Sequence, residues 1–517
     1  MLNSYPMVIS RRRFTLGSLA GLAACLPTRL QALRPGPKLF VFLIAEQFRQ
    51  LYLDRSRDLL GPGGFRELMT KGVHYPNCRL AASGFTASGL ASLATGAYPS
   101  LHGIIADQWY DRRTRALSKA RADMLEATTL ADEVSRAGHS RIYCLGLYEG
   151  TTSLLMGRSP GPVFWMDTQG QFTTRGNAPE WLAAFNNDRP IDKLHDEKWT
   201  AVGAGSDLPP LRTLTYDPRK PEDFFALYQS SPFCQDAQFE FLQAVLAAEK
   251  LGQGQTLDFV FLSLGAMALL GYETGSDSPL MDQMTLRLDQ QIQRTLAMLD
   301  KTPGKNNYNL VFAAAHGSPP EPDPALRLQM AISGESIARA IEKALSDRFD
   351  KGPLKNVYID KYVYPFLYLN LEMLQKLGIP FRGARKLAGE AALRLPGVAG
   401  YYTADGDCSH TGEWRRRFEN SFHPLRSGDV MLSYDAQAVE DFGFNRGVSY
   451  GSLYNYDTVV PLMLYGPQFG GGVIERGIES VDLAPTIARA AGIGMPSSAT
   501  GNVLGDAFAE GDEERPK

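Results

Sequence analysis

Short, almost uninterrupted apolar runs constrain the fold of this chain more than any other sequence feature. Such runs are typical of strands that are buried on both faces of a parallel sheet. Helical patterns separate the runs, and this alternation predicts an α/β fold with a mainly parallel sheet flanked by helices. The predicted strands are Lys38–Ala45, Arg141–Leu147, Leu257–Leu264, Tyr308–Ala314 and Val459–Tyr465, and the predicted helices are Thr86–Ala94, Ala237–Leu251 and Pro279–Leu299.

Length and composition limit the class of protein. The chain has 517 residues, which is too long for one small domain, and 44% of them are hydrophobic, which is ample for a large core. Charged residues make up 21%, a globular rather than a disordered composition. The formal net charge is -3, so there is no basic surplus and we expect no nucleic acid partner.

Two stretches interrupt the alternation. Residues 159–223 are rich in Pro, Gly, Trp and Asp and look like a loop-rich cap. Residues 319–442 contain helix and strand patterns of their own, so we expect an inserted subdomain between core segments 37–318 and 443–508. The acidic end of the chain, residues 509–517, has a disordered composition. The elements predicted in the insertion are Ser333–Ser346, Val363–Leu369, Gly383–Arg394 and Val398–Thr403.

The first 32 residues have the order of features found in a bacterial export signal. Arg11–Arg13 precede an apolar run that is too short to span a bilayer, and this order resembles a twin-arginine signal. Leu22–Cys25 also resembles a lipobox, in which a lipid on Cys25 would anchor the mature protein to a membrane. The alternative is cleavage near Ala32, which would discard the cysteine. We therefore expect an exported, periplasmic protein, either anchored or free.

The remaining cysteines give little evidence of a metal site. None of them is spaced as C-x-x-C, so we do not expect a zinc site built from thiolates. An oxidising periplasm would allow disulfides, but the spacing does not indicate which cysteines would pair. These four residues are Cys78, Cys144, Cys234 and Cys408.

Three residues at the ends of predicted elements are candidate site residues on general grounds. Glu46 ends the first strand, where α/β proteins place their sites and a carboxylate can hold a metal ion, although a solvated carboxylate is the commoner role. Thr86 begins a helix, where the helix dipole favours an anion and a threonine can act as a nucleophile. The commoner role of a threonine there is an N-cap. Ser88 is a weaker nucleophile candidate on the same turn.

A series of motifs then resembles the alkaline phosphatase superfamily, in order, over residues 37–508. The resemblance is strongest to its type I phosphodiesterase/nucleotide pyrophosphatase-like branch and to bacterial periplasmic alkaline phosphatases with a threonine nucleophile. It implies an alkaline phosphatase-like core, a two-metal phosphoester hydrolase site, and Thr86 at the position of the nucleophile. The motifs are FTASGLASLATGAYPSLHGI, WYDR, RLDQQI, AAAHGS, NSFHPLRSGDVML, GSLYNYDTVVPLMLYG and SVDLAPTIARAAGI.

The resemblance places one of the two metal sites on residues that supply no carboxylate and no imidazole. The Asp-x-x-x-His pair of the family falls at Ala268 and Tyr272, and its last histidine falls at Tyr450. A shifted register would offer Glu273 or Asp277, but no histidine. We expect the rings of Tyr272 and Tyr450 to fill the vacated space.

The second metal site keeps more of its donors. Its positions fall at Glu46, Thr86, Ala315 and His316, where Ala315 replaces an aspartate. Three donors would hold one ion weakly with the help of water. The alternative role for His316 is a buried, hydrogen-bonded histidine. We therefore expect at most one zinc or other divalent ion, or none.

The positions that would contact phosphate are also changed. The asparagine of the family, two residues before the tryptophan of WYDR, is Asp107 here. A carboxylate at this position of the substrate site would repel a phosphate dianion. The Lys and Arg that bind phosphate in the threonine branch have no counterpart in residues 147–153.

Together these changes predict an impaired homologue. We expect an alkaline phosphatase/phosphodiesterase-like protein that acts in binding or scaffolding, with an unknown small-molecule or ester ligand. One alternative is an active phosphate- or sulfate-ester hydrolase that uses Thr86 with one residual ion. Another is a structural lipoprotein that binds no ligand in its cleft. The sequence does not decide whether the protein is an enzyme.

Overall fold

The computed structural model describes residues 36–138, 140–203, 208–320, 331–353, 355–436, 438–440 and 450–509. The predicted export signal, with Cys25, lies outside the described residues, as does the predicted tail beyond residue 509. Within the described part of the chain, no helix combines the length and the apolar character needed to cross a membrane.

A ten-stranded sheet forms the centre of the protein. The middle strands β5, β10, β1 and β11 are parallel, and β6 continues the parallel run at one side. A short strand β20 (Ile478–Glu479) pairs with β2 next to β19. The main path is β19 (Gly472–Val473), β2 (Val73–Arg79), β18 (Val459–Tyr465), β11 (Tyr308–His316), β1 (Leu39–Gln47), β10 (Asp258–Leu264), β5 (Arg141–Leu145), β6 (Val163–Met166) and β7 (Phe172–Thr174).

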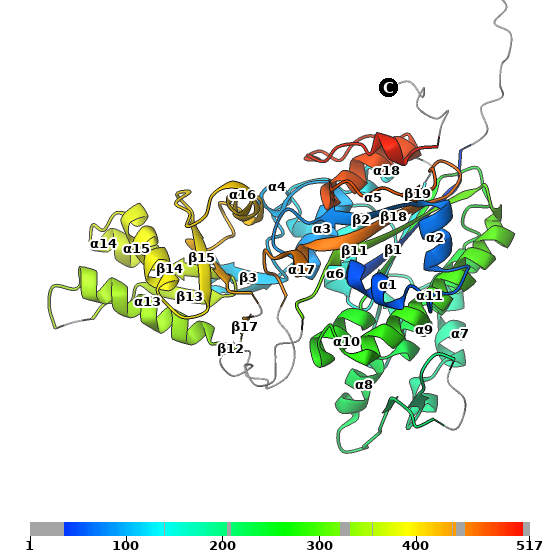
Figure 1. The fold of residues 1–517 in the computed structure, drawn as a ribbon, viewed down its shortest axis with the longest axis horizontal. Helices are drawn as coiled ribbons and strands as arrows, with labels where there is room; N and C mark the ends of the chain where they lie inside the picture. The colour runs from blue at the N-terminus through cyan, green and yellow to red at the C-terminus, as the bar shows by residue number, and fades with distance from the viewer. Residues whose placement is uncertain are drawn as a thin grey trace, which may run out of the picture. The chain divides into compact units, whose positions relative to one another are not determined.

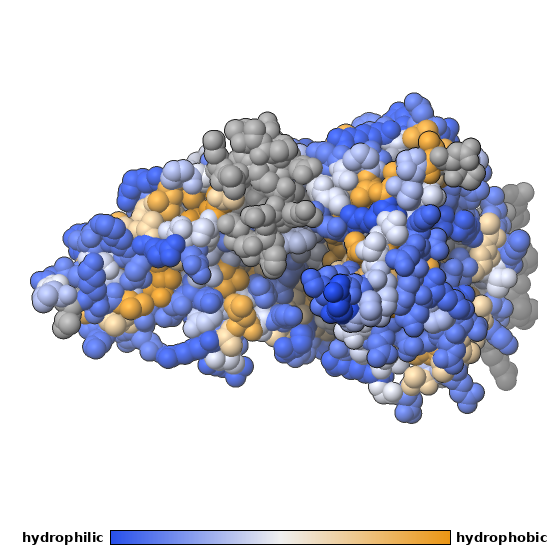
Figure 2. Space-filling model, turned by 90° about the horizontal axis from the view of Figure 1, so that it is seen from below, coloured by the Kyte–Doolittle hydropathy of each residue, from blue (hydrophilic) through white to orange (hydrophobic). Residues whose placement is uncertain are grey.

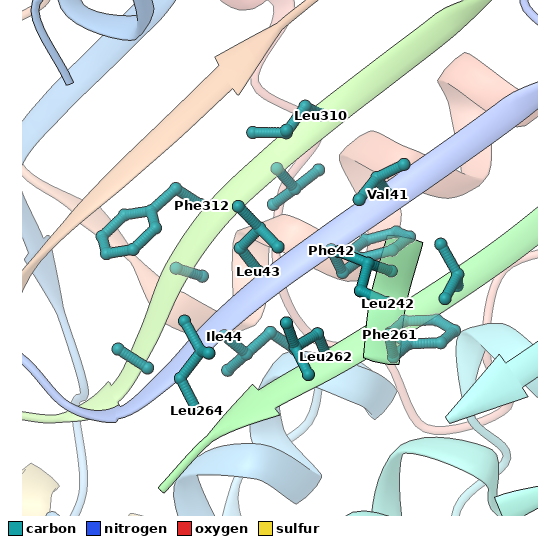
Figure 3. Close-up of a cluster of buried hydrophobic side chains, with 14 of the residues drawn as sticks. Val41, Phe42, Leu43, Ile44, Leu242, Phe261, Leu262, Leu264, Leu310 and Phe312 are labelled. Atoms are coloured by element: carbon teal, nitrogen blue, oxygen red, sulfur yellow. The ribbon is translucent and has the colours of Figure 1, made fainter. Parts of the chain in front are cut away.

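Complete burial of the middle strands explains their apolar sequences. Every residue of β1, β10 and β11 is buried, and side chains of neighbouring strands lie in register, as Figure 3 shows for Phe42 and Phe261. These two rings stack with centroids 4.3 Å apart. Such a pair adds about 0.5–1.5 kcal/mol to the burial of its area. The predicted mainly parallel α/β sheet is therefore confirmed.

Strand β18 was predicted as a parallel strand, and this prediction is wrong. It runs antiparallel to both β11 and β2. The chain leaves β11 after His316, and when it returns the amide of Gly317 donates to the carbonyl of Asp457, 2.7 Å away and just before β18. Because β18 starts at the edge where β11 ends, it must run in the opposite direction. An apolar run carries no information about direction.

Helices cover both faces of the large sheet (Figure 1). The helix predicted at Pro279–Leu299 has those bounds, because Ser278 caps it and Pro279 occupies its first turn. Helices on one face are α1 (Gln50–Ser56), α2 (Phe65–Lys71), α9 (Pro232–Ala248), α10 (Ala266–Thr274) and α11 (Pro279–Leu299); on the other face lie α3 (Thr86–Thr95), α5 (Leu130–Ala137), α6 (Glu149–Met156) and α18 (Leu483–Ala491).

The predicted loop-rich cap contains more regular structure than expected. Its strands β6 and β7 extend the large sheet, and the ring of Phe172 stacks on Phe241 of α9 at a centroid distance of 4.0 Å. A composition rich in Gly and Pro indicates turns and gives no information about such aromatic packing. The other elements are α7 (Glu180–Asp188), β8 (Lys198–Trp199), β9 (Arg212–Thr213) and α8 (Pro221–Gln229).

The predicted insertion contains a second sheet of four antiparallel strands with its own buried cluster. The single strand predicted at Val363–Leu369 is a hairpin, because the chain turns at Tyr364 and Pro365, and a proline cannot continue a ladder. The elements are α13 (Gly334–Phe349), β13 (Ile359–Val363), β14 (Phe366–Leu369), α14 (Leu371–Lys376), α15 (Phe381–Leu393), β15 (Val398–Thr403), α16 (Gly412–Ser421) and β16 (Val430–Tyr434).

A buried carboxylate joins the second sheet to the core. Asp429 is 2% exposed and accepts from the amide of Leu369 at 2.7 Å and from Nε of Arg385 at 2.8 Å. It also accepts from Arg112, which follows the core strand β3 (Gln108–Asp111). Both sheets belong to the one unit that begins at Pro37. The boundaries of the insertion stay a prediction.

Two further observations complete the description. The four cysteines in the described part of the chain are free, so the disulfides that the sequence left open are not formed between them. On the face of the molecule seen in Figure 2, hydrophilic residues predominate and hydrophobic ones are interspersed among them. The remaining elements are α4 (Pro99–His102), β4 (Ala116–Lys119), β12 (Ala331–Ile332), β17 (Val439–Glu440) and α17 (Asn455–Thr458).

Candidate functional site

The candidate site lies where β1 and β11 end and α3 begins. The two strands are parallel, and their register pairs Gln47 with His316. Glu46 and His316 therefore reach the same edge of the sheet. Helix α3 approaches this edge closely, because a Cβ atom on Gly89 would lie only 2.0 Å from the carbonyl oxygen of Ala315. This close approach brings Thr86, the first residue of α3, to the strand ends.

Thr86 contacts His316 directly. Its Oγ1 lies 2.9 Å from Nε2 of His316. Nδ1 of His316 lies 2.6 Å from the carbonyl oxygen of Gly317, so Nδ1 carries the hydrogen and Nε2 accepts from the threonine hydroxyl. Burial lowers the pKa of His316 to about 4, so the imidazole is neutral at pH 7.

The alternative role of Thr86 as an N-cap is wrong. Phe85 occupies the N-cap position with an extended backbone, and Thr86 is the first helical residue. Ser88, the weaker nucleophile candidate, is buried and its hydroxyl donates to the carbonyl oxygens of Ser83 and Phe85, 3.3 and 3.2 Å away. Of the two hydroxyls on this turn, only that of Thr86 contacts a residue of the candidate site.

Asp107 and Tyr450 form the second half of the network. Oδ1 of Asp107 accepts from the amide of Ala87 at 2.8 Å, and Oδ2 accepts from the hydroxyl of Tyr450 at 3.0 Å. The ring of Tyr450 stacks on His316 with centroids 4.5 Å apart and an interplanar angle of 16°. Tyr450 therefore bridges the Asp107 carboxylate and the His316 imidazole; its role as a ring that fills a vacated metal site stays a prediction.

The pKa values of both Asp107 and Tyr450 are higher in this site than in water. Burial raises the pKa of Asp107. The neighbouring Asp107 carboxylate, together with burial, raises the pKa of Tyr450 well above its usual value. Tyr450 is therefore a phenol at neutral pH and a stable hydrogen-bond donor.

Glu46 is a buried acid rather than a solvated strand-end carboxylate. Its side chain is 5% exposed, and the hydroxyl of Ser263 donates to Oε1 at 2.9 Å. Burial raises the pKa of Glu46 to about 7; the Ser263 hydrogen bond opposes the rise, and Asp107 adds to it. Two acids, Glu46 and Asp107, thus give the site its electrostatic character.

Ala268 and Tyr272 occupy one face of α10, four residues apart. Both are half-buried, and burial raises the pKa of Tyr272. No described contact joins Tyr272 to His316 or Tyr450, so its predicted role as a space filler stays a prediction. The residues of the shifted register are engaged elsewhere: Glu273 pairs with Arg212 at 3.0 Å, and Asp277 pairs with Arg55 at 2.8 Å.

The donor set does not fit two metal ions. In the described ranges, no group of three or more His, Cys, Asp or Glu residues is placed to hold an ion. Both ring nitrogens of His316 and both carboxylate oxygens of Asp107 have partners inside the protein. Ala315 and Ala268 have no donor atom. Thr86 and His316 bind each other, as do Asp107 and Tyr450.

Two contributors to the site were not predicted. Ser263 holds Glu46, and its position was visible as the single hydroxyl in the apolar run DFVFLSL of β10. Asp457 is fully buried, accepts from the amide of Ser452 at 2.9 Å, and uses its carbonyl to hold Gly317. Burial raises its pKa to about 7. The polar sequence Asn455–Asp457 is typical of an exposed loop, so it does not indicate that Asp457 is buried.

Comparisons with known proteins agree with this fold. The model of the type I phosphodiesterase/nucleotide pyrophosphatase family matches residues 40–372. The alkaline phosphatase PafA of Elizabethkingia meningoseptica is 23% identical over 520 residues, covering 91% of this chain and 94% of the relative. A protein of Myroides odoratus named calcium-transporting ATPase is 24% identical over 526 residues, covering 92% of this chain and 95% of the relative.

Solved structures show the same architecture. The crystal structure of wild-type alkaline phosphatase PafA superposes with a TM-score of 0.80 at 23% identity, covering 92% of this chain and 99% of that one. Murine ectonucleotide pyrophosphatase/phosphodiesterase 5 superposes with a TM-score of 0.54 at 16% identity, covering 91% and 100%. The alkaline phosphatase-like fold expected from the sequence is therefore confirmed.

Proposed function

This chain belongs to the type I phosphodiesterase/nucleotide pyrophosphatase family, and from that premise we propose that it has lost two-metal hydrolysis and serves as an exported binding or scaffolding protein. Its ligand is an uncharged small molecule or ester. The twin-arginine signal and the lipobox at Cys25 support export and a lipid anchor, respectively.

The observation that carries this proposal is the position of Tyr450. Its hydroxyl donates to Asp107 while its ring lies against His316, so one side chain occupies both halves of the site. A metal ion would need to displace this ring and break the Thr86–His316 hydrogen bond. Two-metal hydrolysis requires ions that stabilise both the attacking and the leaving oxygen. The described residues supply no such pair of sites.

Charge supports the same proposal. The carboxyl groups of Asp107 and Glu46 are both buried and interact electrostatically with each other. A phosphate dianion brought to this site would meet carboxyl groups and no cationic side chain in residues 147–153. A ligand without net charge is not repelled by these carboxyl groups.

Hydrolysis assays with added zinc test the proposal. We expect turnover of p-nitrophenyl phosphate and bis-p-nitrophenyl phosphate by the wild-type protein to equal that of Thr86→Val. Thr95→Val is the matched control in the same helix, because the Thr95 hydroxyl donates to the Ala91 carbonyl at 2.7 Å and accepts from the Ala97 amide at 3.2 Å, both away from the candidate site. Zinc-dependent turnover that Thr86→Val abolishes and Thr95→Val keeps would overturn the proposal.

One observation favours a second candidate function. Thr86 keeps the first position of α3, where a helix N-terminus stabilises an alkoxide, and its hydroxyl already donates to a neutral imidazole. The alternative is therefore a phosphate- or sulfate-ester hydrolase that uses Thr86 with one ion. Zinc-dependent turnover of p-nitrophenyl sulfate, lost in Thr86→Val, is the result that would select it.

A further inference from the structure

A cavity lies close to the C-terminal end of α3. The helix has ten residues, which at about 1.5 Å per residue places its ends roughly 15 Å apart. Tyr98, two residues after the Gly96 C-cap, lines a cavity of about 570 Å³. Pockets for small ligands measure about 300–1,000 Å³. The cavity is thus large enough for a ligand and is separate from the Thr86 site.

One wall is a preformed hydrogen-bond network. Glu479 of β20 accepts from the hydroxyl of Tyr98 and from Arg416 of α16. The guanidinium of Arg416 also lies 3.2 Å from the Tyr98 hydroxyl. The three side chains come from the core, the insertion and the C-terminal part of the chain, and each fixes the other two. A ligand that binds here meets polar groups that are already ordered, which lowers the entropy lost on binding.

Other lining residues are also held by hydrogen bonds. Arg476 makes two hydrogen bonds to Asp506, both 2.6 Å long, and lies over the ring of Tyr75. Asp482 accepts from the amide of Glu479 at 2.9 Å and from the amide of Asn502 at 2.7 Å. The Asp482 contacts fix the backbone of two lining residues, Glu479 and Asn502.

The charges on the cavity wall balance one another. The charged side chains of the lining are Arg416, Arg476, Glu479 and Asp482, two of each sign. A free anion or cation therefore gains little net attraction and meets like charge on one side. A neutral ligand with many hydroxyl groups can donate to the carboxylates and accept from the guanidinium groups, since a hydroxyl does both.

Exposed hydrogen-bonding groups complete the site. The side-chain amide of Asn502 is exposed, and among the described residues it has no hydrogen-bond partner, while its backbone amide is fixed by Asp482. Thr500 beside it is also exposed; its backbone amide donates to the carbonyl of Gly96 at 2.7 Å, and its hydroxyl donates to the same carbonyl at 3.4 Å and can still accept from a ligand. We propose that this cavity is a binding site for a neutral saccharide, held between the Arg416–Glu479 pair and the side chains of Thr500 and Asn502.

This inference does not depend on whether the Thr86 site is catalytic. Binding of the full chain to an array of immobilised neutral, acidic and amino glycans tests it, with Asn502→Leu as the test variant. Asn306→Leu is the matched control, because Asn306 is an exposed asparagine in the loop before β11. Both substitutions alter exposed side chains, so both variants are expected to fold.

We expect the wild-type protein and Asn306→Leu to bind at least one neutral glycan, and Asn502→Leu to bind it at least tenfold more weakly. Thr500→Val is expected to weaken binding in the same direction. Millimolar inorganic phosphate and spermidine should not compete. The proposal is overturned if no neutral glycan binds, if only charged glycans bind, or if Asn502→Leu and Thr500→Val both bind like the wild-type protein.

Discussion

The two ends of helix α3 show opposite uses of polar side chains. At the N-terminal end, Thr86, His316, Asp107 and Tyr450 satisfy one another in a buried network. At the C-terminal end, the polar groups around Tyr98 are also paired, but they enclose a cavity and leave side chains such as Asn502 exposed. Polar residues that bind one another stabilise the fold, whereas those that border a cavity remain available to a ligand.

The difference also concerns charge. The acids Glu46 and Asp107 at the N-terminal end have raised pKa values, because burial disfavours their charged forms. At the C-terminal end each carboxylate of the cavity wall faces a guanidinium or a backbone amide. The first arrangement excludes anions, and the second is close to neutral. The predictions below alter one end or the other, beginning with the largest expected effect.

Restoring donors at the N-terminal end should produce the largest change. In Ala315→Asp combined with Tyr450→His, the network is opened and two donors are added beside Glu46 and His316. We expect this double variant to bind about one zinc ion per chain. It should also be strongly destabilised in EDTA, because an unpaired buried carboxylate costs several kcal/mol. Elemental analysis and Tm with and without zinc would measure both effects.

The control for that experiment is Ala314→Asp. Ala314 is equally buried, but side chains alternate along a strand, so the substitution places a carboxylate on the other face of β11. We expect a similar loss of stability without rescue by zinc. A double variant that gains no zinc while remaining folded would show that Tyr450 and Ala315 are not what excludes the metal.

Removing one hydroxyl should have a smaller effect. Tyr450→Phe deletes the donor to Asp107 and leaves a buried acceptor unpaired, which costs about 1–3 kcal/mol of unfolding free energy. Tyr272→Phe is the matched control, since Tyr272 is half-buried and no described residue accepts from its hydroxyl. We expect that change to stay within about 0.5 kcal/mol. If urea unfolding gave the same loss of free energy for Tyr450→Phe and Tyr272→Phe, the hydrogen bond from Tyr450 to Asp107 would not be important for stability.

The raised pKa of Glu46 predicts a pH dependence of stability. Its pKa is about 7 in the folded protein and near 4.5 in the unfolded chain, so between these values the folded state binds more protons. The stability due to this group is full below pH 4.5 and falls by roughly 3 kcal/mol as pH rises to 7. A metal ion on Glu46 would keep it ionised and abolish this fall.

Comparison with a variant isolates this contribution. Glu46→Gln does not titrate, so the difference in unfolding free energy between it and the wild-type protein should change between pH 4.5 and 7. Glu335→Gln is the control, because Glu335 is 88% exposed and should give a flat difference. A flat difference for Glu46→Gln as well would mean that Glu46 is ionised throughout.

The smallest effect on stability is expected at the C-terminal end of α3. Asn502→Leu changes an exposed side chain that has no partner in the described part of the protein, so the free energy of unfolding should change by less than about 0.5 kcal/mol. The same substitution should nevertheless weaken saccharide binding. A large fall in Tm would instead show that Asn502 stabilises the loop, so that a loss of binding in this variant could not be assigned to the side chain alone.

Local signals explain which parts of the fold could be predicted. The sequence around Ser278 and Pro279 defines the start of α11, because a capping hydroxyl and a proline act within one turn. Apolar runs located β1, β10 and β11 for a similar reason. The direction of β18 and the hairpin at Tyr364 depend on where distant segments return to the sheet, which no local pattern records.

The candidate site could also be predicted from the sequence only in part. The family resemblance located Thr86 and His316, and the structure places them 2.9 Å apart. The hydrogen bond between Asp107 and Tyr450 joins residues 343 positions apart, and neither residue type suggests the other as a partner. The acid at 107 could be predicted to repel phosphate, but its role in holding Tyr450 could not, since that role requires the folded geometry.

The most direct test of the account is the metal content of the exported protein, purified without chelators and measured by elemental mass spectrometry. The account predicts no stoichiometric zinc or other divalent ion in a folded sample, because Tyr450, Asp107, Thr86 and His316 bind one another. About two zinc ions per chain would contradict it and show a working two-metal centre.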